Sequence, residues 1–172
     1  MIFDLINRQK LRRCLIYAVY MILTLLAQNV LFSRISILGV KAMFVPAAVV
    51  AVGMFEGGVW GAVFGLFTGL FCDMGYGNTA LFLWLFPAIG FFAGIVARYY
   101  VNKSFFSFLC VSGMAFLFTA FFQSFGLLVF KGQFSMRLVL TGLVQVLFSL
   151  PLAAPFYFIC RKVAPSPGRD AD

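Results

Sequence analysis

The chain has 172 residues, of which 63% are hydrophobic and 10% are charged. Polar residues are too few to cover a globule in water, so this composition excludes a soluble domain and indicates one integral membrane domain. The net charge of +8 does not predict a nucleic-acid surface, because the basic residues lie at the ends of apolar runs. There they favour a fixed topology in the lipid bilayer and contact with anionic lipid headgroups.

The first three apolar runs predict three membrane spans. A basic segment precedes the first run, about 14–32, which lacks a cleavage pattern, so we expect an uncleaved span with a cytoplasmic N-terminus. The second apolar run, 43–55, is too short to cross a membrane unless residues 37–40 extend it, so we expect a second span over about 38–55. We expect a tight turn at Glu56–Gly58, with Glu56 solvated, before the third span, about 58–72. A single helix over both runs would be about 45 Å long, with a glutamate in its middle.

Glycines recur at every fourth position of the third span, and Asp73 and Gly77 continue the register. Small residues at this spacing share one helical face and let a second helix approach closely in lipid. The candidate helix-packing or partner-binding residues are Gly57, Gly61, Gly65, Gly69, Asp73, Gly75 and Gly77. The sequence leaves open whether this face packs within its own bundle or against a partner. Asp73 could accept hydrogen bonds from the N–H groups of a turn over 75–79, or pair with a basic residue of a partner.

Three further spans are expected, about 79–97 with a kink at Pro87, 105–130 and 138–160. They complete a transmembrane domain over 1–163, which a disordered polar tail, 164–172, follows. The predicted fold class is thus an all-α polytopic membrane protein with six transmembrane helices and cytoplasmic N- and C-termini. This topology places nine basic residues inside and four outside, as the positive-inside rule requires.

Polar residues inside the runs are few. Gln28, Gln123 and Gln145 are interior polar positions, which we expect either to hydrogen-bond between helices or to line a path for a polar solute. The four cysteines are interpreted as small buried hydrophobes. The chain has no histidine, and its two span-end acids, Glu56 and Asp73, are expected near opposite membrane faces. No catalytic acid–base pair can be assembled from them, so we expect no enzyme, no metal and no cofactor.

Three segments carry recognisable motifs: AQNVLFSRISILGVK at 27–41, GAVFGLFTGLFCDMGYGNTAL at 61–81 and APFYFICRKV at 154–163. Together they resemble the MreD family of bacterial rod shape-determining membrane proteins. The chain departs from the family pattern at Ala42-Met43, where many members carry Pro-Asp, and at Gln123, near which many carry an acid.

The resemblance implies a non-enzymatic scaffold of the cell-elongation machinery, located in the bacterial cytoplasmic membrane and coupled to lateral peptidoglycan synthesis. The partners it implies are MreC, the actin-like MreB, and the elongation glycosyltransferase and transpeptidase pair. It also implies a fold similar to the six-helix substrate-binding S components of energy-coupling-factor vitamin transporters. The alternative function is therefore capture of a vitamin-like molecule, in a pocket near the outer face lined by groups such as Trp84 and Tyr76.

Overall fold

The structure is a computed structural model, which describes residues 8–31, 36–37, 40–41, 43–76, 80–99, 104–131 and 136–163. Its six α-helices are α1 (Arg8–Leu26), α2 (Val45–Glu56), α3 (Gly58–Tyr76), α4 (Leu81–Tyr99), α5 (Phe105–Lys131) and α6 (Met136–Val163). A one-turn π-helix, η2 (Ala27–Leu31), continues α1, and two short antiparallel strands, β1 (Ser36–Ile37) and β2 (Val40–Lys41), precede α2. Within these ranges the predicted all-α class and the number of helices are confirmed. The expected tail, 164–172, lies outside the described residues.

The second expected span is wrong at its start. Residues 37, 40 and 41 are in the paired strands, and α2 begins only at Val45. Pro46 lies in the first turn of α2, where its fixed φ suits a helix and its missing N–H costs nothing. The resulting helix of 12 residues is about 18 Å long, which is shorter than a hydrocarbon core of about 30 Å.

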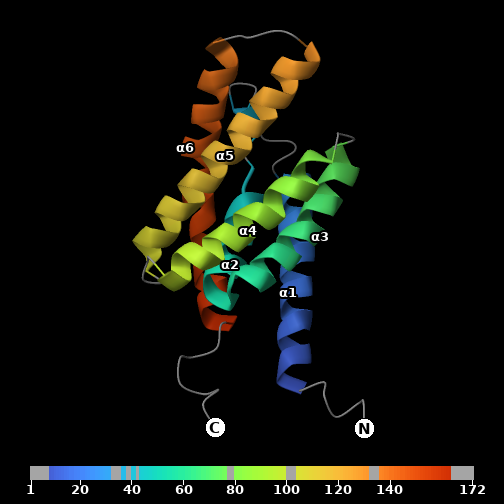
Figure 1. The fold of residues 1–172 in the computed structure, drawn as a ribbon, viewed down its shortest axis with the longest axis vertical. Coiled ribbons are helices and arrows are strands. Elements are labelled where there is room, and N and C mark those ends of the chain that lie inside the picture. Colours follow the sequence, from blue (N-terminus) through green and yellow to red (C-terminus); the bar gives the residue numbers. More distant parts are fainter. Residues whose placement is uncertain are drawn as a thin grey trace.

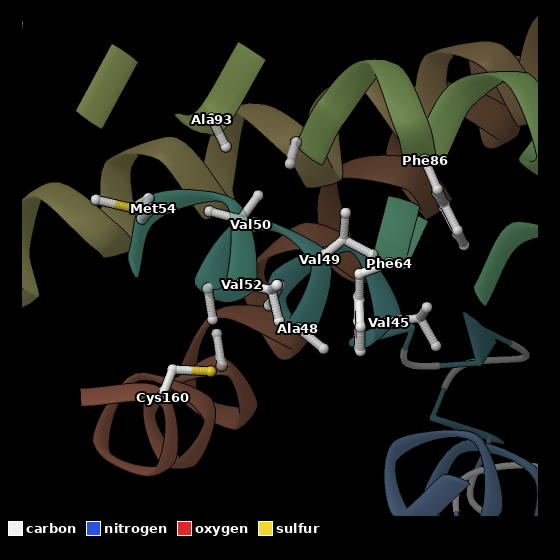
Figure 2. Packing of buried hydrophobic residues seen from close by; sticks show 14 of the residues in the cluster. Val45, Ala48, Val49, Val50, Val52, Met54, Phe64, Phe86, Ala93 and Cys160 are labelled. Atoms are coloured by element: carbon white, nitrogen blue, oxygen red, sulfur yellow. The ribbon is translucent and has the colours of Figure 1, made fainter. Parts of the chain in front are cut away.

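Helix α2 is the centre of the fold. Every residue from Val45 to Phe55 is buried, and α1, α3, α4, α5 and α6 all pack against it. Figure 2 shows its side chains pointing to several neighbours at once, with Ala93 of α4 on one side and Cys160 of α6 on another. A helix that is apolar all round is stable only when protein or lipid surrounds it completely, and here the other helices do so. Since α2 is enclosed, its length need not match a bilayer.

The remaining helices form an elongated bundle around α2 (Figure 1). Helices α3 and α4 are a closely packed antiparallel pair, and α5 packs against α6. The first residues of α1 and the last residues of α6 lie at the same end of the molecule (Figure 1), which we call the basic end because Arg98, Arg161 and Lys162 are also there.

Three helical segments of the described chain are long and apolar enough to cross a membrane: Leu81–Tyr99, Phe105–Gln123 and Val144–Val163. Leu15–Leu26, Val45–Glu56 and Gly58–Met74 are shorter apolar helices. Helix α4 is continuous through Pro87. Large apolar side chains are exposed on every one of these helices except α2, which indicates an apolar rather than an aqueous surrounding.

Candidate functional site

The glycine stripe of α3 faces α4. A methyl group placed on Gly65 would lie 2.6 Å from the carbonyl carbon of Phe86 and 2.8 Å from the nitrogen of Pro87. One placed on Gly69 would lie 2.9 Å from the carbonyl carbon of Phe82. All these atoms belong to the backbone of α4, so neither position has room for any other residue type at the present helix separation. The stripe therefore supports helix packing within the chain.

Gly61 marks a point where three helices meet. Its added methyl group would lie 2.6 Å from both the Cα of Gly53 in α2 and the carbonyl oxygen of Gly90 in α4. Glycines from three helices thus surround one point, and each permits the approach of the other two. One turn toward the basic end, the backbones of Gly58 in α3 and Gly94 in α4 are also in close contact. A methyl group added to Gly94 would meet the backbone of Gly58 and of Gly57.

Other members of the predicted set have different places. Gly57 joins α2 to α3 with φ of +102°, a conformation that glycine adopts at little cost, and an added methyl group there would meet no atom within 4 Å. The turn expected at Glu56–Gly58 is thus present. Gly75 is inside the last turn of α3, and Gly77 lies outside the described residues.

Asp73 joins α3 to the beginning of α4. Its two carboxylate oxygens accept hydrogen bonds from the backbone N–H groups of Phe82, at 3.3 Å, and Leu83, at 2.8 Å. These are the second and third residues of α4, whose amides have no acceptor within the helix. Asp73 therefore acts as an N-cap supplied by another helix, and its negative charge lies at the positive end of the α4 dipole. The expected position of Asp73 after the third helix is wrong, because α3 continues to Tyr76. Residues 77–79 of the turn that Asp73 was expected to bond lie outside the described residues.

Two of the interior glutamines lie at the beginning of α2. The Oε1 atom of buried Gln28, in η2, accepts a hydrogen bond of 3.2 Å from the N–H group of Phe44. Gln123 of α5 donates to the sulfur of Met43 at 3.4 Å. The Met43 N–H group donates in turn to Ser149 of α6 at 3.3 Å. Side chains from three helices thus form hydrogen bonds with residues 43 and 44, just before α2 begins deep inside the protein. A buried helix end requires such partners, because water cannot reach its free backbone groups.

Gln145 is one turn of α6 before Ser149 and is half-buried. It shares a helical face with Ser149, as the spacing of four predicts. The sequence also places Thr141 on this face, four residues before Gln145, but the side chain of Thr141 lies outside the described residues.

Glu56 is not the solvated turn residue that the sequence predicts. It is the last residue of α2, it is half-buried, and its carboxylate accepts a hydrogen bond of 2.8 Å from the Tyr17 hydroxyl of α1. The bond ties α1 to the end of α2. The cysteines also differ in part from expectation, since Cys72 and Cys160 are buried but Cys110 is exposed.

Sequence reasoning missed the residues opposite the stripe. Gly90 and Gly94 are spaced by four in α4, and this spacing could have identified them as the complementary face. Gly53 is a lone glycine in a buried helix and gives no such signal. Tyr17 could not have been paired with Glu56 from sequence, because 39 residues separate them.

The arrangement is chemically suited to holding helices at fixed positions. The half-buried acids Glu56 and Asp73 lie on different helices, and each accepts hydrogen bonds that connect two helices. Within the described residues, no three His, Cys, Asp or Glu side chains lie close enough to hold a metal ion. Comparison of the chain with protein-family models, with curated proteins and with solved structures found no match.

Proposed function

We propose that this chain is a non-enzymatic scaffold of the bacterial cell-elongation machinery, embedded in the cytoplasmic membrane by six helices with both termini in the cytoplasm. The observation that carries the proposal is the use made of the polar side chains. Asp73, Gln28 and Glu56 each connect one helix to another, so they support a fixed shape on which partner proteins can assemble. The three sequence motifs that resemble MreD supply the cellular process.

The membrane placement has two supports. Helices α4, α5 and α6 contain segments long and apolar enough to cross a bilayer. The start of α1 and the end of α6 lie at the same end of the bundle, as an even number of crossings requires (Figure 1). Helix α2 can be too short to cross alone because the protein encloses it on all sides, and only lipid-facing helices must match the bilayer.

The glycine stripe is occupied by α4, so a partner helix such as one from MreC would meet a different face. The opposite side of α3 is available, where Trp60, Phe67 and Phe71 are exposed. Large rigid aromatic side chains contribute much of the energy of protein–protein contacts. Substitutions in the stripe therefore test the folding of the bundle, whereas substitutions at Phe67 and Phe71 test the contact with a partner.

The proposal is tested by depleting the chain in its own rod-shaped host and following cell shape by microscopy. We expect rods to become round, wild-type chain to restore them, and a Phe67→Ala/Phe71→Ala variant that still inserts and folds to restore them less well and to co-purify less MreC. Cells that remain rod-shaped but acquire a vitamin requirement would refute the scaffold function. Tight binding of a vitamin to the purified chain would instead support the substrate-capture alternative.

A further inference from the structure

The basic end carries cations on three helices. Arg8, Lys10, Arg12 and Arg13 occupy the first two turns of α1, Arg98 is in the last turn of α4, and Arg161 and Lys162 are in the last turn of α6. The side chains of Arg98, Arg161 and Lys162 are exposed, and among the described residues none of the three forms an ion pair with an acid. The described acid nearest this end, Glu56, is half-buried, and its carboxylate accepts a hydrogen bond from the Tyr17 hydroxyl. The positive charge of these three side chains is therefore not neutralised by the described residues.

Two of these cations, Arg98 and Arg161, lie close to exposed apolar groups. The guanidinium of Arg98 is 5.7 Å from the ring centroid of Tyr99, which is itself exposed. The exposed apolar residues Phe158 and Ile159 lie three and two residues before Arg161 in α6, and a spacing of three places Phe158 on the same helical face as Arg161. A side chain that is apolar near the backbone and charged at its tip suits the boundary between acyl chains and headgroups. A soluble acidic protein or a nucleic acid would meet only the charged tips.

We propose that the basic end is a binding surface for anionic phospholipid headgroups, with Arg98, Arg161 and Lys162 as contacts. The inference goes beyond the scaffold function and does not depend on the partner proteins. It does rest on membrane placement with this end in the cytoplasmic leaflet, where anionic lipid attracts basic segments. One cation near an anionic surface favours association by about fivefold.

The two tryptophans of the chain report on its two ends. Trp60 is exposed near the start of α3. The next residue, Gly61, lies beside Gly90 of α4, which is eight residues before Arg98, so Trp60 is about 10 Å deeper along the helix than Arg98. Trp84 is exposed in the first turn of α4, at the opposite end. A Trp84→Phe variant therefore leaves a reporter beneath the basic end. A Trp60→Phe variant leaves a reporter at the other end, which serves as the matched control.

The experiment reconstitutes these full-length variants in vesicles and measures fluorescence quenching by brominated phosphatidylglycerol and by brominated phosphatidylcholine. We expect Trp60 to show at least a fivefold preference for the anionic lipid and Trp84 little preference. In 1 M salt the preference at Trp60 should fall toward one, because the screening length shortens to about 3 Å. Adding Arg98→Gln should reduce it severalfold, Arg98→Lys should retain it, and Lys131→Gln/Arg137→Gln at the opposite end should leave it unchanged.

One cation could compensate for the loss of another, so the triple variant Arg98→Gln/Arg161→Gln/Lys162→Gln removes all three. We expect it to lose the preference for anionic lipid at Trp60. An undiminished preference in the triple variant, or equal quenching by both lipids at Trp60 in the parent, would overturn the inference. So would loss of the preference on adding polyglutamate or a DNA duplex, which would make the surface a site for a soluble polyanion. Absence of quenching by either lipid at both tryptophans would instead refute the membrane placement.

Discussion

Replacing Gly65 by alanine tests the central packing feature of the fold, the contact between α3 and α4. The new methyl group would lie 2.6 Å from the carbonyl carbon of Phe86, whereas ordinary van der Waals contact begins at 3.4 Å. The obstructing atoms are backbone, so no side-chain rotation can relieve the clash, and the helices must separate by roughly 1 Å. Overpacking of this kind costs about 3 kcal/mol, at the upper end of its usual range. For a chain of this size, we expect the melting temperature to fall by roughly 10 °C.

Gly113→Ala in α5 is the matched control. A methyl group there has as its nearest neighbour the Cδ2 atom of Leu150, at 3.8 Å, which is an ordinary contact. Alanine is also a better helix former than glycine by roughly 0.5–1 kcal/mol, so this variant should be as stable as the parent or slightly more stable. Thermal unfolding of both variants in detergent, followed by circular dichroism, compares them directly. Equal melting temperatures for Gly65→Ala and the parent would refute the reasoning, as would equal losses in both variants.

Three further substitutions test the hydrogen bonds that connect helices, each by thermal unfolding. Asp73→Ala should cost about 1 kcal/mol by removing the cap of α4, and Asp73→Asn should recover part of it; an alanine variant of parental stability would contradict the capping role. Gln28→Leu should cost about 1–3 kcal/mol, since it leaves the buried N–H group of Phe44 without that acceptor; no loss would show that another group replaces it. Tyr17→Phe should cost about 1 kcal/mol by removing the hydroxyl that donates to Glu56, and should lower stability no further when Glu56→Gln is added.

Much of the helix pattern follows from local composition. The expected spans over 79–97, 105–130 and 138–160 differ from α4, α5 and α6 by at most three residues at either end, because apolar runs bounded by basic and small residues set these ends. The break between α2 and α3 was also predictable, since Gly57 follows a glutamate in an apolar context and supplies a positive φ. The start of α2 was not predictable, because only the pairing of β1 with β2 excludes residues 37, 40 and 41 from a helix.

By itself, then, the sequence determined the all-α class, most of the helical segments and the presence of a face that permits close approach, because these depend on composition and on the spacing of glycines. The tertiary structure decided which helix that face meets. It also decided that Asp73 caps α4, that Gln28 accepts a hydrogen bond at the start of α2 and that Glu56 accepts a hydrogen bond from α1. The reason is physical: a carboxylate or amide can satisfy any nearby donor, and only the packing of distant segments around α2 brings one donor within reach.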